Sequence, residues 1–203
     1  TNVGADVQDL YREKLDPSIY AQEGSQPPLY YVLGWVATSW LPAGDFEIAQ
    51  TENPMTRMGN PLTNHNPNLY RPLAAPGATW MLVMTLRGLS LAMSCFTLVL
   101  SYRLARRITG NDSLALLTAS FVAFNPMVLF INASATNDNL VMLLNTATLV
   151  ALADLWFEAG PLRLRHAFGV GLLLGLSALT KLNGLVLWPI AALVIAYRGL
   201  RGA

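Results

Sequence analysis

Two ionisable side chains stand at the edges of long apolar stretches, where a charge is costly unless it has a partner or a task. Lys181 could bind a lipid phosphate as a point charge, or it could be a lone cation that extends to the membrane surface. Asp138 could orient a neighbouring group or help to hold a metal ion. It follows Thr136 and Asn137, so it could equally belong to the first turn of a helix that one of these two residues caps.

Two further polar candidates precede an aromatic and aliphatic segment, Glu23-Gly-Ser-Gln-Pro-Pro-Leu-Tyr-Tyr-Val-Leu-Gly-Trp35. Pro27 biases Gln26 towards an extended conformation, and Pro28 suits the first turn of a helix. The aromatic and aliphatic residues that follow are typical of a membrane–water boundary. Glu23 and Gln26 are therefore expected just outside the bilayer, either beside a simple interfacial anchor or as groups that bind a ligand.

Other residue types that carry chemistry are sparse. His65 and His166 stand alone, and the single cysteine, Cys95, lies inside an apolar block. The sequence therefore predicts neither a disulfide framework nor a metal site within this chain. No cofactor is expected, although the sequence leaves open a divalent metal ion in a longer parent protein.

The composition favours a membrane as the solvent of this chain. Hydrophobic residues make up 53% of it, charged residues only 12%, and the mean hydropathy is +0.40. A soluble domain carries about twice this charged fraction. The apolar residues form long blocks rather than helical stripes, which indicates membrane-embedded helices. With a formal charge of +1 and no basic run, the sequence predicts no nucleic-acid partner.

The blocks predict an all-α fold, a polytopic transmembrane helical bundle with an external loop and juxtamembrane helices. Residues 1–86 are expected to form the external loop region, with interfacial or re-entrant helices at 28–41 and 73–86. Whether 28–41 spans the membrane is left open, because it is shorter than the roughly 20 residues of a spanning helix. Residues 87–203 are expected to form the bundle, with spans at about 87–105, 114–131, 138–157, 166–180 and 183–198.

Two local features shape these boundaries. A continuous helix through 73–105 would put Arg87 near mid-membrane, which is costly for an unpaired charge, so the sequence favours a break there with Arg87 at the interface. Asn125-Pro126 interrupts the uncharged 18-residue block 114–131 and predicts a kink.

The arginines predict the orientation. The connections that follow every second span carry seven arginines in all, whereas the intervening connections, 132–138 and 181–184, carry one positive charge, Lys181. By the positive-inside rule the arginine-bearing connections are cytoplasmic. Residues 1–86, Asp138 and Lys181 are then expected on the outer face, where the candidate residues converge.

Several short motifs follow one another along the chain: Gln26-Pro-Pro-Leu-Tyr-Tyr31, Leu86-Arg-Gly-Leu-Ser90, Tyr102-Arg-Leu-Ala-Arg-Arg107, Phe124-Asn-Pro126, Ser134-Ala-Thr-Asn-Asp-Asn-Leu140 and Gly175-Leu-Ser-Ala-Leu-Thr-Lys181. Their order and spacing resemble polytopic C-type glycosyltransferases, the group of the dolichyl-phosphate-mannose protein mannosyltransferases and the bacterial lipid A aminoarabinose transferases.

This resemblance implies an integral membrane transferase, in a plasma membrane of bacterial type, that moves a sugar from a polyprenyl-phosphate donor to an acceptor on the outer face. It implies that Glu23 and Gln26 line the approach of the donor phosphate. Asp138 would support the site, and Lys181 would contact the phosphate. The partners implied are the lipid bilayer and the polyprenyl-phosphate sugar.

One departure from the family pattern bears on activity. The family's catalytic acid lies in an acidic pair upstream of the Pro-Pro-Leu element, and residues 1–26 contain no such pair. The chain opens at Thr1 without a visible signal peptide, and the sequence is interpreted as a fragment that begins after that pair. No catalytic residue is expected within it. The alternatives are a transporter or permease segment, or a non-enzymatic membrane assembly protein of the same architecture.

Overall fold

A computed structural model of the protein describes residues 26–42, 44 and 77–202, and all regular structure in these ranges is helical. The expected all-α fold is confirmed. The elements are α2 (Leu29–Thr38), α4 (Ala78–Thr109), α5 (Asp112–Ala123), α6 (Pro126–Asn132), α7 (Asn137–Phe157), α8 (Leu164–Ala178), the 3₁₀ helix η2 (Leu182–Leu187) and α9 (Trp188–Gly202).

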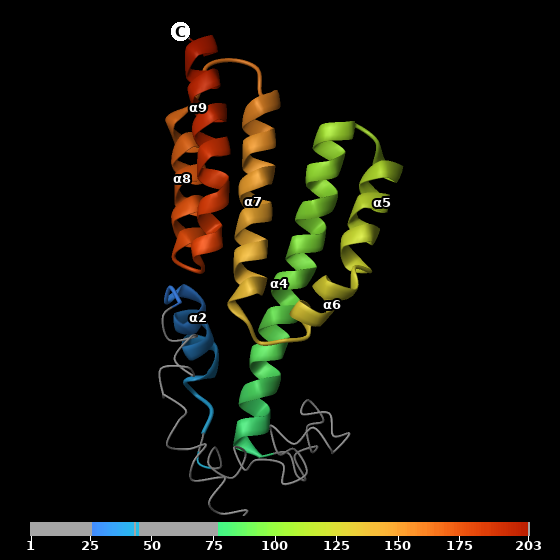
Figure 1. Cartoon of the computed structure of the whole chain (residues 1–203), viewed down its shortest axis with the longest axis vertical. Coiled ribbons are helices and arrows are strands. Elements are labelled where there is room, and N and C mark those ends of the chain that lie inside the picture. The colour runs from blue at the N-terminus through green and yellow to red at the C-terminus, as the bar shows by residue number, and fades with distance from the viewer. Residues whose placement is uncertain (1–25, 43, 45–76, 203) are drawn as a thin grey trace, which may run out of the picture.

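The helices form a bundle (Figure 1). Helices α7, α8 and α9 lie side by side, α4 runs along the other flank of α7, and α5 folds back along α4. The short helix α2 lies beyond the lower end of α8 as drawn, beside α4. Glu23, His65 and the start of the predicted 73–86 helix lie outside the described residues.

Three helical stretches of the described chain are long and apolar enough to cross a membrane: 78–109, 137–157 and 182–201. Helices α5 and α6 make a fourth if they count as one bent span. Helices α2 and α8 are apolar but shorter. Large apolar side chains such as Phe96 and Phe121 point outwards, as expected where lipid replaces water as the solvent. The protein is an integral membrane protein.

The predicted break at Arg87 is wrong. Helix α4 runs without interruption for 32 residues, from Ala78 to Thr109, and Arg87 is exposed on it. At 1.5 Å per residue, such a helix is about 48 Å long, whereas the hydrocarbon core is about 30 Å thick. About 24 Å of that length separates Arg87 from Arg103, so the two charges can reach opposite membrane surfaces by extending their side chains, and no break in the helix is needed.

The predicted kink at Asn125-Pro126 is confirmed. Helices α5 and α6 meet there at a bend of 64°. The Asn125 side chain accepts hydrogen bonds from the backbone N–H groups of Met127 and Val128, so it caps α6, and Pro126 occupies the first turn of that helix. The bend is therefore a helix end followed by a new start rather than a distorted single helix.

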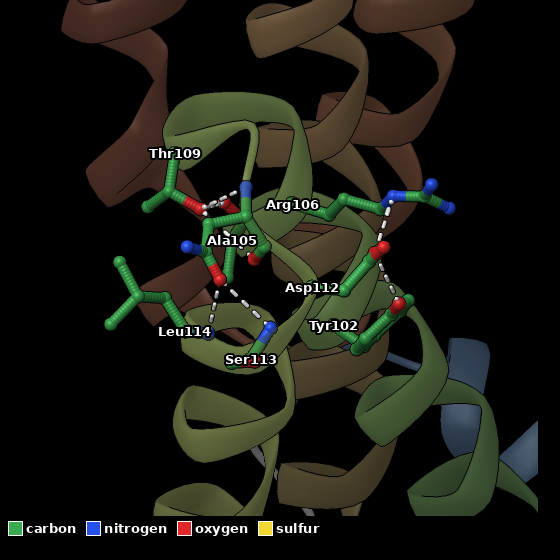
Figure 2. A network of polar contacts seen from close by, with 8 residues as sticks. Tyr102, Ala105, Arg106, Thr109, Asp112, Ser113 and Leu114 are labelled. Carbon is green, nitrogen blue, oxygen red and sulfur yellow. Dashed lines mark hydrogen bonds and ion pairs between the residues drawn. The ribbon is translucent and has the colours of Figure 1, made fainter.

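The turn from α4 to α5 is held by polar groups at both ends (Figure 2). Gly110 closes α4 in the left-handed conformation, φ 66°, and the Asn111 side chain caps α5. Asp112 in the first turn of α5 accepts hydrogen bonds from Arg106 Nε at 2.8 Å and from the Tyr102 hydroxyl at 2.9 Å. These contacts fix α5 antiparallel to α4.

Small polar and apolar residues fill the contacts between helices. Leu152, Val170, Leu174, Leu187 and Ala191 form one buried cluster among α7, α8, η2 and α9. The Ser177 hydroxyl of α8 donates a hydrogen bond to Asn145 Oδ1 of α7 at 2.6 Å. Small residues such as Ser177 and Ala191, and interhelical hydrogen bonds, are typical of helix packing in membranes.

Candidate functional site

Asp138 and Lys181 form an ion pair at one end of the bundle. The Lys181 Nζ lies 2.6 Å from Asp138 Oδ1, although 43 residues separate the two in sequence. The Lys181 side chain is 24% exposed and that of Asp138 is 37% exposed, so the pair is partly buried and still reachable from outside. A lysine ammonium has three donors, so one bond to Asp138 leaves two for a ligand.

The start of α7 holds Asp138 in place. Thr136 is the N-cap of this helix, and its hydroxyl accepts a hydrogen bond from the Asp138 backbone N–H. The same hydroxyl lies 3.3 Å from Asp138 Oδ2. Thr136, one of the two residues expected to cap α7, therefore does so, and Asp138 belongs to the first turn as well as to the ion pair.

Asn139 fastens the turn that precedes α7. Its fully buried side chain donates two hydrogen bonds from Nδ2, to the carbonyl oxygens of Ile131 at 3.2 Å and of Ser134 at 2.9 Å. These bonds tie the end of α6 to the start of α7. They therefore help to set the direction of the neighbouring Asp138 side chain.

Lys181 lies between α8 and η2, and its backbone is extended, with φ −160° and ψ 144°. Its backbone N–H donates to the Ser177 carbonyl at 3.1 Å, and its own carbonyl accepts from Gly184 N–H at 2.8 Å. Gly184 packs directly on Ser177, where a Cβ atom would lie 2.5 Å from backbone atoms. The close approach of η2 to α8 thus determines where Lys181 sits.

The Pro-Pro-Leu segment joins the same end of the bundle through its main chain. The Leu29 N–H donates a hydrogen bond to the Leu179 carbonyl at 3.0 Å, two residues before Lys181. Tyr30 is buried in a cluster with Met93 and Leu140, and Leu140 follows Asp138 by two residues. Gln26, three residues before Leu29, is half-buried.

Several buried polar atoms around this end have no hydrogen-bond partner among the described residues. They are the Tyr30 hydroxyl, the Ser90 hydroxyl, Asn132 Oδ1, Asn137 Nδ2 and Asn139 Oδ1. Burial raises the pKa of the Tyr30 phenol, and the neighbouring Ser90 hydroxyl partly opposes this rise. The two hydroxyls are close but do not form a hydrogen bond. Unpaired buried groups of this kind are places where a water molecule or a polar ligand group gains hydrogen bonds.

The structure thus brings together Asp138, Lys181 and the segment that begins at Gln26, while Glu23 lies outside the described residues. Sequence reasoning did not single out Asn139, Tyr30 or Ser90. Asn139 and Tyr30 could have been found from their positions, because Asn139 follows Asp138 and Tyr30 follows the Pro-Pro-Leu motif.

The opposite end of the bundle is rich in arginine and carries ion pairs of its own. Arg107 Nε pairs with Asp154 at 3.0 Å, and His166 Nδ1 lies 2.8 Å from Glu158 Oε2. No group of three or more His, Cys, Asp or Glu that could hold a metal ion occurs within residues 26–42 and 77–202.

Comparison with known proteins gives one family. The model of the dolichyl-phosphate-mannose-protein mannosyltransferase family matches residues 67–198, which is more than half of the 203 residues. No curated protein and no solved structure matches the chain.

Proposed function

Because the chain belongs to the dolichyl-phosphate-mannose-protein mannosyltransferase family, we propose that it carries the donor-phosphate subsite of a membrane glycosyltransferase that uses a polyprenyl-phosphate sugar. The observation that supports this assignment is the ion pair of Lys181 and Asp138, which lies beside the Pro-Pro-Leu segment. In this proposal the site opens on the outer face of a bacterial plasma membrane.

Lys181 is the phosphate-binding cation of the proposal. Its ammonium group is held at 2.6 Å by Asp138 and keeps donors for phosphate oxygens. Lysine is a common phosphate ligand as a point charge. A cation held in advance at the leaving phosphate stabilises the negative charge that develops there during transfer.

Asp138 is a positioning residue in this proposal, because it acts through Lys181. It holds the ammonium group in place and balances its charge before the donor enters. Gln26 and Glu23 are proposed to line the approach of the donor phosphate, with Gln26 supported by its place three residues before Leu29.

The proposed reaction is an inverting transfer. The acceptor oxygen forms a bond to the anomeric carbon while the bond from that carbon to the phosphate oxygen breaks. The electron pair of the broken bond goes to the polyprenyl phosphate beside Lys181, and the acceptor proton goes to a carboxylate that acts as general base. That base is not assigned to a described residue of this chain.

The test is sugar transfer from a polyprenyl-phosphate sugar by the full-length protein, together with binding of the donor. Lys181→Gln is expected to lower transfer by about 100-fold or more, because it removes a cation at the developing charge. Lys181→Arg should retain part of the activity. Asp138→Asn should weaken transfer less, and the two changes should be non-additive in the double variant, because one residue acts through the other.

Asp112→Asn is the matched control, since it removes an acid that is also paired with a basic side chain but lies at the opposite end of the bundle. It should leave transfer unchanged. Lys181→Gln with normal transfer and normal donor binding would overturn the assignment, and the ion pair would then be a structural contact only.

A further inference from the structure

An apolar groove opens between α4, α7 and α9 at the arginine-rich end of the bundle, with a volume of about 310 Å³. Along α7 it begins at Leu149, about 17 Å from Asp138, and extends to Phe157, about 28 Å from Asp138. Side chains from all three helices line it, among them Leu104, Ile108, Trp156, Phe157, Ile190 and Val194.

Two guanidinium groups stand at the aromatic end of this groove. The Arg107 Cζ lies 5.6 Å from the centre of the Phe157 ring. On the other side, Arg201 Cζ lies 4.6 Å from the Tyr197 ring, which stacks on Trp156 at 4.8 Å and 15°. A guanidinium group stacked on a ring keeps its N–H donors in its own plane, where they can bind a phosphate.

The charge at this end is not balanced by its acids. Asp154 pairs with Arg107, Asp112 pairs with Arg106, and Glu158 lies against His166. Arg201 makes no ion pair within the described residues.

Arg198 adds a second unbalanced charge. It lies four residues after Val194, on the same side of α9, and donates from Nη2 to the Gly160 carbonyl at 2.8 Å. Its side chain is nine-tenths buried, and its Nε has no hydrogen-bond partner among the described residues. A buried N–H without a partner and an unpaired exposed guanidinium group at one groove both favour an anionic ligand.

We propose that this groove binds one anionic phospholipid, with part of an acyl chain along the apolar wall and the phosphate at Arg201 and Arg198, whose charges no acid among the described residues balances. The volume is near the lower end for ligand pockets, roughly 300–1,000 Å³, and suits a segment of one chain rather than a whole lipid. The site does not depend on glycosyl transfer, and it lies at the end of the bundle away from Lys181.

The orientation predicted from the arginines adds to this argument. If the arginine-rich end faces the cytoplasm, the groove opens into the leaflet that carries the anionic lipids, whose surface attracts basic side chains. Anionic phospholipids would then be abundant in the leaflet that surrounds the groove.

Lipid retention measured by native mass spectrometry tests the proposal. The protein is released from mixed micelles that contain phosphatidylglycerol or phosphatidylcholine with the same acyl chains. One phosphatidylglycerol should remain per chain, in preference to phosphatidylcholine. Arg201→Gln should reduce that preference by about fivefold, which is the effect of one basic residue near an anionic surface. Arg163→Gln, an exposed arginine at the same end, should not change it.

A second pair of variants tests the groove itself. Ala153 lines the groove, and Ala153→Phe should abolish retention by filling it, whereas Ala192→Phe at an exposed position of α9 should not. Equal retention of the two lipids, or equal effects of the two arginine variants, would overturn the proposal. The proposal would also be overturned if the protein proved to be a dimer and Ala153→Phe dissociated it without loss of the lipid. The groove would then be assigned to a second copy of the chain.

Discussion

At the scale of single residues, the Lys181–Asp138 pair is better suited to positioning than to stabilising. Both side chains are partly exposed, and ion pairs that water can reach contribute about 0–1 kcal/mol. Asn139 has the opposite character. It is fully buried, and its two hydrogen bonds satisfy carbonyl groups at the end of α6 and in the turn that follows.

Asn139→Leu should therefore destabilise the protein although it keeps the size of the side chain. The change leaves the Ser134 carbonyl oxygen without its donor, and an unpaired buried group costs about 1–3 kcal/mol. The Ile131 carbonyl loses one of two donors and still accepts from the Ser134 N–H. Thermal unfolding in detergent should show a lowered midpoint. Asn183→Leu is the control, because Asn183 is exposed. Equal midpoints for the two variants would mean that these hydrogen bonds contribute nothing to the fold.

The candidate site was predictable from the sequence in part. Asp138 and Lys181 were identifiable because a charge at the edge of an apolar block is costly without a partner, and the distribution of arginines predicted that both lie on one face. Their contact at 2.6 Å was not predictable, because it depends on how far α8 descends along α7 before η2 begins. That depth is set by the packing of Gly184 on Ser177, which no periodic pattern records.

At the scale of helices, the close contact between α8 and η2 controls the position of Lys181. Gly184→Ala should weaken this contact, because the new Cβ would lie 2.5 Å from the backbone of Ser177 and the two elements would have to separate. Such overpacking costs about 1–3 kcal/mol. The expected result is a lowered unfolding midpoint together with weaker donor binding.

Gly175→Ala in α8 provides the comparison, because a Cβ atom there meets nothing within 4 Å. It should be neutral or stabilising by up to about 1 kcal/mol, since alanine favours a helix over glycine. If both glycine variants behaved alike, the position of Lys181 would not depend on the η2 contact.

The helices themselves were largely predictable, and the exceptions have physical causes. Blocks of apolar residues predicted α7 and the bend at Asn125-Pro126. The break at Arg87 was predicted from the cost of a charge near mid-membrane, whereas α4 continues past this residue. A hydrophobic pattern reports where lipid begins, whereas the hydrogen bonds of a helix can continue into the interface. The 3₁₀ form of η2 arises from its contact with α8, which local sequence does not determine.

At the scale of the whole molecule, the bundle has two chemically different ends. One carries Asp138, Lys181 and the Pro-Pro-Leu segment, and the other carries most of the arginines together with the apolar groove. The proposed glycosyl transfer and the proposed phospholipid site therefore face opposite sides of the membrane.

Labelling of single cysteines by a membrane-impermeant maleimide in intact cells tests this orientation. In a Cys95→Ala background, Asn183→Cys at the Lys181 end should be labelled from outside. Ser113→Cys at the arginine-rich end should be labelled only after the cells are permeabilised. Both native residues are exposed. The reverse pattern would place the proposed donor site in the cytoplasm and would contradict the positive-inside prediction.

The link between α2 and the rest of the bundle has a consequence for the evolution of this chain. The hydrogen bond from Leu29 to Leu179 joins two main-chain atoms, and Leu29 is the first residue after two prolines that has an N–H to give. Mutational drift can therefore replace either side chain without removing the donor or the acceptor. Only a third consecutive proline, at position 29, would remove the donor. The hydrogen bond between α2 and the end of α8 therefore depends on the backbone and not on any particular side chain.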